Sequence, residues 1–275
     1  MNLLHDFFTY AFLTRALIVG ILVSLCAALL GVSLVLKRYS MIGDGLSHVG
    51  FGALAVATAL NAAPLAVAVP VVIVAAFGLL SINERARLKG DAAIALISSG
   101  ALAVGIMAVS LKSGTNADVY NYMFGSILSL SVADTWVSVI LSVAVLTLYI
   151  LFFHRIFSVT FDEPFARATG TRTRLYSLML ALLTAVTVVL GMRMMGTLLI
   201  SSLIIFPALT AMRVCRKYKS VIICAAVISV GCFICGMVLS YVLETPTGAS
   251  IVCVNILTFF VFWIIGLCKG YGKSV

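Results

Sequence analysis

Long apolar stretches follow one another along almost the whole chain, separated by short polar segments. They lie near residues 16–36, 44–60, 64–82, 92–111, 133–153, 174–191, 195–212, 220–242 and 249–268. A membrane-spanning helix needs about 20 predominantly apolar residues, whereas a spanning β-barrel would show short segments of alternating hydrophobicity. The pattern therefore predicts an all-α membrane protein, a polytopic helical bundle of eight or nine transmembrane helices, with residues 1–275 forming one domain.

The composition strengthens this prediction. Hydrophobic residues make up 63% of the chain and charged residues 10%, and the mean hydropathy is +1.22, far from the values of soluble domains. The first run has Asp6 and Arg15 before it, without a basic n-region or a small-residue cleavage site. We therefore expect this run to be a retained helix and not a signal peptide.

Basic residues concentrate in alternate connections between the apolar runs. Nearly all of the 18 Lys and Arg residues fall on one side of the predicted bundle. The exceptions are Arg15, Lys112 and Arg193, and their side also carries Asp6, Asp118, Asp134 and Glu244. Because cytoplasmic loops carry the excess of Lys and Arg, we expect the N-terminus outside and the C-terminus in the cytoplasm, in the inner membrane of a bacterium. The net charge of +9 then reflects topology, and no nucleic-acid binding is needed to explain it.

Two other patterns carry no chemistry in this interpretation. The seven cysteines lie in or at the ends of apolar runs, except Cys215, and the pair Cys232 and Cys235 has no second pair to complete a tetrahedral site. We expect them to be small buried apolar residues. Gly272-Lys273-Ser274 resembles the end of a phosphate-binding loop, but Leu267 stands where that loop needs its first glycine. The chain is therefore not expected to bind ATP itself.

Asp44 and His48 lie four residues apart inside the stretch YSMIGDGLSHVGFGALAVATAL, Tyr39 to Leu60. On a helix this spacing places both on one face, and Ser47 joins them there, so that a carboxylate, a hydroxyl and an imidazole converge. A carboxylate inside a bilayer costs roughly 2.5–3.5 kcal/mol and is by default a functional-site hypothesis. The pattern indicates half of a divalent-metal site. The alternative is that Asp44 caps its helix and His48 is a packed side chain.

The ligand types narrow the choice of ion. Carboxylate plus imidazole suits Mn, Zn or Fe(II), whereas Cu(I) favours thiolate or thioether. Thioethers are present in Met192, Met194 and Met195. These methionines cluster in a predicted outer turn, GMRMMG, and are more simply explained as interfacial apolar residues.

The longest basic connection, FSVTFDEPFARATGTRTR from Phe157 to Arg174, carries the signals of a short helix. Asp162 suits an N-cap, with Glu163 and Pro164 in the first turn. Gly170 is placed to end the helix. We therefore expect a helix of about two turns in a cytoplasmic loop over residues 157–174. It is either an interfacial linker or a docking element for a cytosolic partner.

Six stretches of the chain resemble the permeases of ABC importers for zinc, manganese and iron. They are LVLKRYSMIGDGLSHVG (Leu34 to Gly50), GDAAIALISSGALAVGIMAVS (Gly90 to Ser110), YMFGSILSLSVADTW (Tyr122 to Trp136), FDEPFARATG (Phe161 to Gly170), GTLLISSLIIFPALTA (Gly196 to Ala211) and TPTGASIV (Thr245 to Val252). They occur in order and at family-like spacing, and they extend over almost the whole chain. The chain is thus similar to a type II ABC importer permease, a transport subunit and not an enzyme.

The resemblance implies roles for the polar residues of the bundle. The Asp and His of the GD-x-x-SH stretch, here Asp44 and His48, are expected to coordinate the passing metal, which is cargo and not a permanently bound cofactor. A transport site must release its ion, so water or a second permease would complete the ligands. Ser47 is a possible pathway residue. Ser201 and Ser202 stand where relatives have small apolar residues, and either line the pathway or bond back to their own helix.

The resemblance also implies partners. A homodimer or heterodimer of permeases in the lipid membrane would work with two cytosolic ATPase subunits and an extracytoplasmic metal-binding protein. The D-E-x-x-A-x-x-x-G loop would be the coupling helix that sits in a groove of the ATPase. Its residues here are Asp162, Glu163, Ala166 and Gly170.

Three other classes of protein fit the residues less well. A permease for cobalamin or an iron-siderophore would not need Asp44 and His48. A proton-coupled secondary metal transporter would carry several carboxylates within its helices, whereas Asp44 is the only clear one in this sequence. An intramembrane enzyme would need a nucleophile and base or a motif such as H-E-x-x-H, and His5 and His154 lie only at the edges of apolar runs. Association with an ATPase separates the ABC permeases from the other two classes.

Overall fold

The computed structural model describes residues 11–85, 90–113, 125 and 132–268, and its described elements are all helices. The long ones are α2 (Ala11–Leu36), α3 (Ser40–Ala59), α4 (Pro64–Arg85), α5 (Gly90–Ser113), α7 (Val132–Leu151), α10 (Thr173–Val214), α11 (Tyr218–Leu243) and α12 (Thr247–Cys268). Two short helices, α8 (Phe153–Phe161) and α9 (Glu163–Ala168), lie between α7 and α10. The predicted positions of His5, Asp6, Asp118 and Gly272-Lys273-Ser274 lie outside the described residues.

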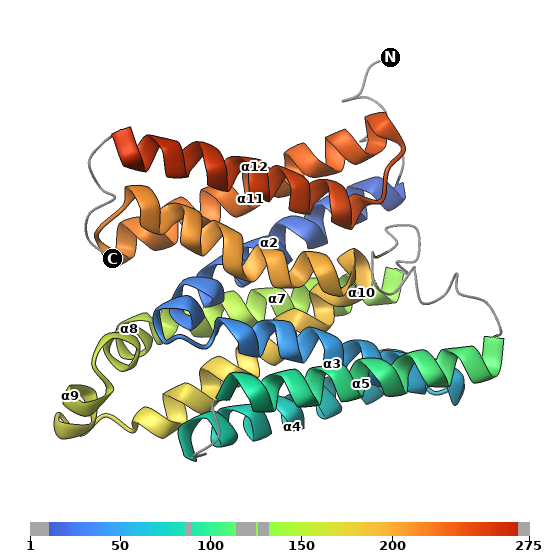
Figure 1. Ribbon diagram of the computed structural model, residues 1–275, viewed down its shortest axis with the longest axis horizontal. Helices are drawn as coiled ribbons and strands as arrows, with labels where there is room; N and C mark the ends of the chain where they lie inside the picture. Colours follow the sequence, from blue (N-terminus) through green and yellow to red (C-terminus); the bar gives the residue numbers. More distant parts are fainter. Residues whose placement is uncertain (1–10, 86–89, 114–124, 126–131, 269–275) are drawn as a thin grey trace.

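The long helices run back and forth between the two ends of one bundle (Figure 1). In the described part of the chain, eight spans are long and apolar enough to cross a membrane: Phe12–Leu36, Pro64–Ile82, Asp91–Lys112, Val132–Leu151, Thr173–Arg193, Met195–Val214, Tyr218–Leu243 and Thr247–Cys268. α3 is less apolar because it contains Asp44 and His48, yet its 20 residues pack against α4, α5 and α10. The predicted polytopic helical bundle is confirmed, with α3 as a further helix of spanning length.

The sharp turn expected between residues 174–191 and 195–212 is confirmed. These two runs form the spans Thr173–Arg193 and Met195–Val214, which the single label α10 joins across a kink. Gly196 interrupts α10 with φ 80° and ψ 165°, a conformation essentially restricted to glycine. The chain bends sharply at this residue, so the two halves of α10 run as separate spans (Figure 1).

The centre of the bundle is formed by α2, α3 and α10. Leu30, Phe51 and Leu199 are fully buried there. Near the edges, α5 and α12 expose apolar side chains such as Leu96 and Leu257. In a bilayer such surfaces face lipid tails or the helices of another membrane protein, because neither contact leaves a polar group unpaired.

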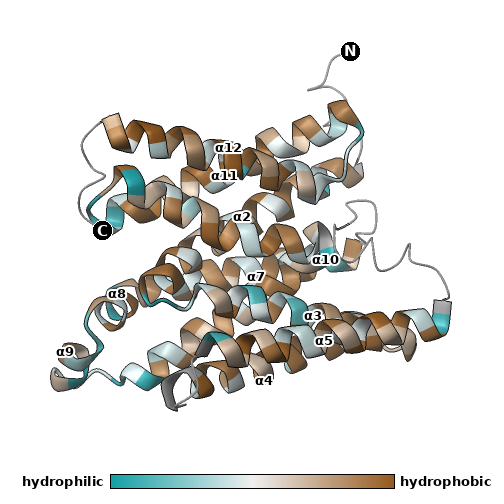
Figure 2. Ribbon diagram, in the orientation of Figure 1, coloured by the Kyte–Doolittle hydropathy of each residue, from teal (hydrophilic) through white to brown (hydrophobic). Residues whose placement is uncertain are grey.

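Hydrophilic side chains gather towards the ends of the bundle (Figure 2). Lys37 and Arg38, in the α2–α3 connection, lie at the same end as α8, α9 and the α10–α11 connection (Figure 1). Glu244 follows α11 at the opposite end, where Arg193 Nη1 also donates to Asp134 Oδ1 over 2.7 Å. The described basic connections therefore lie together at one end of the bundle, as the alternation along the sequence predicts.

The helix α8 was not predicted. The apolar run 133–153 ends as a helix at Leu151, and the chain then turns into α8. The rings of Phe157 and Phe161 lie against the ring of Tyr218, with centroids 4.9 and 5.5 Å away. These aromatic contacts hold α8 against the first residue of α11. They thereby fix the position from which the chain leads to α9.

Three buried hydroxyl groups join α2, α7 and α11 near the same end. Ser33 Oγ lies 3.0 Å from the hydroxyl oxygens of both Tyr149 and Tyr218, which are 3.1 Å apart. Buried polar groups stabilise a unique packing when they are all paired. The last turns of α2 are thus held in a defined position just before the α2–α3 connection.

The cysteines are less buried than expected. Cys26 and Cys232 are buried, but Cys235, Cys253 and Cys268 are exposed, because they lie on outward faces of α11 and α12. A membrane protein is apolar on its lipid-facing surface as well as inside, so hydropathy cannot separate the two positions.

Candidate metal site

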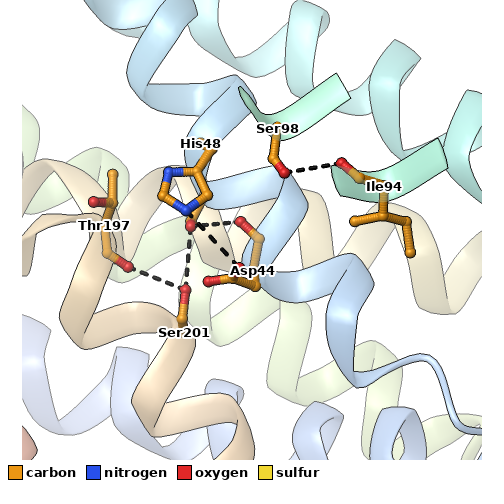
Figure 3. A network of polar contacts seen from close by, with 7 residues as sticks. Asp44, His48, Ile94, Ser98, Thr197 and Ser201 are labelled. Atoms are coloured by element: carbon orange, nitrogen blue, oxygen red, sulfur yellow. Dashed lines mark hydrogen bonds and ion pairs between the residues drawn. The ribbon is translucent and has the colours of Figure 1, made fainter. Parts of the chain in front are cut away.

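Asp44 and His48 lie on successive turns of α3 (Figure 3). Both side chains are on one face of the helix, with His48 Nε2 3.8 Å from Asp44 Oδ2. α3 begins at Ser40 with Tyr39 as N-cap residue, so the alternative that Asp44 caps the helix is wrong. The side chains of His48 and Asp44 are 26% and 39% exposed, which leaves the pair accessible to an ion although α3 packs among other helices.

The second nitrogen of His48 distinguishes it from a packed histidine. Nδ1 is buried and has no hydrogen-bond partner among the described residues. Leaving a buried polar atom unpaired costs about 1–3 kcal/mol, and most buried side-chain polar atoms avoid this by pairing. An imidazole that binds metal uses one nitrogen as ligand and hydrogen-bonds through the other. His48 therefore has ring-nitrogen capacity that protein contacts do not use.

Ser201 of α10 lies beside the pair (Figure 3), and its hydroxyl meets that of Ser47 in α3. Ser47 Oγ donates to the main-chain oxygen of Asp44 at 2.7 Å, and Ser201 Oγ contacts the main-chain oxygen of Thr197 at 3.2 Å. The two hydroxyl oxygens are themselves 3.1 Å apart. Each hydroxyl has one proton, so at most two of these three contacts are hydrogen bonds at any moment. Oxygen lone pairs therefore remain available to a nearby cation.

Ser202 lies elsewhere. Its hydroxyl donates to the main-chain oxygen of Leu199 at 2.8 Å, and the residue is 5% exposed. The two alternatives for the ISS stretch are thus divided between its serines. Ser201 contacts both Ser47 and its own helix, whereas the contact of Ser202 is to its own helix, as serines in spanning helices often make.

Two polar neighbours of the pair were not predicted, Thr197 of α10 and Ser98 of α5 (Figure 3). Ser98 is buried and donates to the main-chain oxygen of Ile94 at 2.8 Å. Isolated serines and threonines carry a weak signal in an apolar helix, because most of them bond to their own backbone. Only the packing of α5 and α10 around α3 singles these two out.

Glycines let the neighbouring helices approach α3 closely. A Cβ atom on Gly45 would lie 2.7 Å from Ile94 Cγ2, and one on Gly52 would lie 2.5 Å from the main-chain oxygen of Ala101. Small residues allow such backbone approach between membrane helices. Because these glycines stand on either side of His48 along α3, this part of α3 lies close against α5.

The methionines beside the bend in α10 are packing residues. Met192 and Met195, expected at the membrane interface, are 1% and 3% exposed. The Met192 methyl group lies directly against the position that a Cβ on Gly50 would occupy. They lie where the spans Thr173–Arg193 and Met195–Val214 meet, as expected for a turn between two spans, but their side chains pack against the protein.

The polar groups around α3 form an incomplete ligand set. Across residues 11–85, 90–113 and 132–268, no group of three or more His, Cys, Asp or Glu side chains could hold a metal ion. Asp44 and His48 offer two strong ligands and the serine hydroxyls offer weak ones, whereas a structural zinc site has about four strong ligands. Such a set can hold an ion and also release it.

The second predicted element, α9, has the expected ends. Phe165 N donates to Asp162 Oδ1 at 2.9 Å, which makes Asp162 the N-cap, and Pro164 lies in the first turn. Gly170, with φ 81°, follows in the left-handed conformation common after helix ends. Ala166 is fully buried, whereas Phe165 is 62% exposed. One side of α9 is therefore anchored to the protein and the other is open.

Glu163 holds α9 through two ion pairs. Its Oε2 lies 3.6 Å from Lys37 Nζ, and its Oε1 lies 3.2 Å from Arg167 Nη2. The Arg167 pair follows from the i,i+4 spacing on one helix. The Lys37 pair joins segments far apart in the sequence and could not be predicted from it.

Comparison with known proteins places this arrangement in a family. The ABC 3 transport family (ABC-3) matches residues 9–266. The chain belongs to this family. The manganese transport system membrane protein MntC of Listeria monocytogenes is 29% identical over 271 residues, which cover 98% of this chain and 96% of that protein. The high-affinity zinc uptake system membrane protein ZnuB of Haemophilus influenzae is 30% identical over 243 residues, covering 88% and 93%.

A solved structure has the same fold as this ABC-3 chain. PsaBC from Streptococcus pneumoniae, in complex with Fab, contains a chain that superposes with a TM-score of 0.85 at 27% identity, covering 95% of this chain and 94% of that one. The predicted family and fold are thereby confirmed. The ABC-3 chain is a multi-pass membrane permease subunit that works within an ABC transporter complex.

Proposed function

We propose that this permease imports a divalent transition metal ion (Mn, Zn or Fe) and that Asp44 and His48 bind the ion in passage. The observation that carries this proposal is the buried, unpaired Nδ1 of His48 in a side chain whose Nε2 lies 3.8 Å from Asp44 Oδ2. A cation between Nε2 and the Asp44 carboxylate would take a ring nitrogen as ligand and balance the carboxylate charge.

The donor set supports a borderline divalent cation. Carboxylate and imidazole ligands suit Mn, Zn and Fe(II), and Ser47 and Ser201 add hydroxyl oxygens. Two relatives point to the same class of cargo by name, MntC for manganese and ZnuB for zinc. The ion is a transported substrate, and water or a second permease supplies its remaining ligands.

The end of the bundle that contains α9 faces the cytoplasm in this proposal. The excess of basic residues at that end supports this orientation, which places the N-terminus outside. α9 then docks in a groove of a cytosolic ATPase subunit, with Asp162 and Gly170 defining its ends and Ala166 anchoring its inner side. A second permease and an extracytoplasmic metal-binding protein complete the importer.

Metal uptake by cells that carry the complete transporter tests the proposal. We expect competition among Mn, Zn and Fe for uptake, and loss of uptake in Asp44→Asn and His48→Ala. Ser202→Ala, which removes a buried hydroxyl bonded to the main-chain oxygen of Leu199 in its own helix, is the matched control and should transport normally. Membrane insertion and co-purification with the ATPase show that each variant folds and assembles.

Normal uptake in either Asp44→Asn or His48→Ala would refute the site. Uptake of cobalamin or an iron-siderophore in place of the free ions would instead refute the proposed cargo. The two results are distinguishable, because the first concerns which residues bind the ion and the second concerns which solute is transported.

A further inference from the structure

Lys37 lies between α2 and α3, the helix of the candidate metal site. The connection comprises the three residues between Leu36 and Ser40. Arg38 adopts a left-handed conformation with φ 59°, and Tyr39 N donates to the main-chain oxygen of Leu34 at 2.8 Å. So short a turn, bonded back to α2, leaves little slack between the two helices.

The side chain of Lys37 reaches three other helices. Its Nζ donates to Ser177 Oγ of α10 at 2.9 Å and lies 3.6 Å from Glu163 Oε2 of α9. Its side chain also lines a small gap between α8 and α10. The residues that line this gap with Lys37 are Ile156, Val159, Thr160, Tyr176, Ser177 and Leu180.

Of the two ion pairs that Glu163 makes, the one with Lys37 should contribute more to stability, because Lys37 is buried. The side chain of Lys37 is 6% exposed, whereas that of Arg167 is 72% exposed. Exposed ion pairs contribute little because water screens them. Removing the partner of a buried charge has a larger effect, since it leaves that charge without compensation in a medium of low polarity.

The geometry points to Lys37 as the residue that transmits movement of α9 to the metal site. This inference rests on the proposed function, in which the ATPase displaces α9. When α9 moves, Glu163 pulls the Lys37 ammonium with it through their ion pair. The short turn then transmits this displacement to α3. Asp44 lies four residues beyond the start of α3 at Ser40, about 6 Å along the helix axis.

A small shift of α3 against α10 is enough to change the ion's surroundings. The Asp44–His48 pair moves with α3, whereas Ser201 stays with α10, and the two helices meet at the 3.1 Å contact between Ser47 and Ser201. Shifts of 1–2 Å between packed helices are roughly what switching proteins use. Movement of α3 therefore alters which oxygens the ion can reach.

The test uses the complete transporter, with its ATPase and binding protein, in proteoliposomes. Lys37→Met keeps most of the stem and removes the charge. Arg38→Gln, at an exposed neighbouring position, makes the same change in net charge and is the matched control. We expect Lys37→Met to retain basal ATP hydrolysis but to lose metal-stimulated hydrolysis and uptake by about tenfold, the scale of coupling within one ion-pair network. Arg38→Gln should behave as wild type.

A charge exchange separates transmission from mere packing. Lys37→Glu and Glu163→Lys each place like charges together, and the double variant restores the attraction. We expect the double variant to take up metal faster than either single variant. A double variant no better than the singles, or wild-type uptake by Lys37→Met, overturns the inference.

The outcome for Asp44 separates this inference from the proposal on which it rests. Normal uptake by Asp44→Asn refutes the proposed function and this inference with it. Normal uptake by Lys37→Met in a transporter that Asp44→Asn inactivates overturns the role of Lys37 alone.

Discussion

The hydroxyl oxygens of Ser47 and Ser201 lie 3.1 Å apart, although the residues are 154 positions apart in the chain. Ser47 belongs to the helix that carries Asp44 and His48, and Ser201 belongs to the half of α10 that follows the bend at Gly196. The contact therefore fixes the rotation of the candidate ligand helix against α10 at the level of the site.

Removing the Ser201 hydroxyl should weaken metal binding. We expect Ser201→Ala to lower the apparent affinity for metal in uptake assays by roughly tenfold, the scale seen when residues that support metal ligands are replaced. Ser202→Ala is the control, because its hydroxyl bonds to Leu199 of its own helix. Equal kinetics for the two variants would show that Ser201 has no part in the site.

Gly52 should not tolerate a side chain. The methyl group of Gly52→Ala would meet the main-chain oxygen of Ala101 at 2.5 Å, and overpacking of this kind costs about 1–3 kcal/mol. We expect a lower unfolding temperature for the purified protein. A Cβ on Gly100 would have no atom within 4 Å, so the Gly100→Ala variant should not have a lowered unfolding temperature. Similar losses in both variants would contradict the close α3–α5 contact.

The cap of α9 should matter for coupling. Asp162→Ala removes the acceptor for Phe165 N, which costs about 1 kcal/mol, and should reduce ATP hydrolysis stimulated by metal-loaded binding protein. Asp162→Asn keeps a capping oxygen and should retain most of the stimulation. If the asparagine variant is as impaired as the alanine variant, the charge of Asp162 and not the cap is what coupling requires.

Gly170, which follows the C-terminal end of α9, should also matter for coupling. A β-branched side chain in the left-handed region is strained by roughly 1–2 kcal/mol, whereas the space around Gly170 is open. Gly170→Val should therefore reduce stimulated ATP hydrolysis through the backbone alone. Metal binding by the purified transporter should stay normal, and its loss would place the effect at the ion site instead.

Chemical labelling can establish the orientation. In a cysteine-free background, Lys217→Cys in the α10–α11 connection should react with a membrane-impermeant thiol reagent only after permeabilisation. Glu244→Cys, between α11 and α12, should react from outside. Both positions are exposed in the structure. The reverse pattern would invert the proposed topology.

Much of the architecture could be predicted because it depends on properties of single segments. Apolar runs of sufficient length have to become helices in a bilayer, where backbone groups must pair internally, and the segregation of charge follows from the connections between them. Asp44 and His48 could be placed on one face from their spacing alone, and α9 from its capping residues. α8 escaped prediction because its apolar start merges with the run of α7.

The sequence by itself therefore determined the long helices, their alternating direction and the Asp44–His48 pair, since these arise from interactions within a few turns of chain. Only the tertiary structure decided that Ser201 and not Ser202 meets Ser47, and that Lys37 meets Glu163. Adjacent residues on a helix point about 100° apart, so the one that faces a neighbour depends on how the whole helix is rotated. That rotation is set by contacts along its length, among them those at the glycines of α3, which no local pattern encodes.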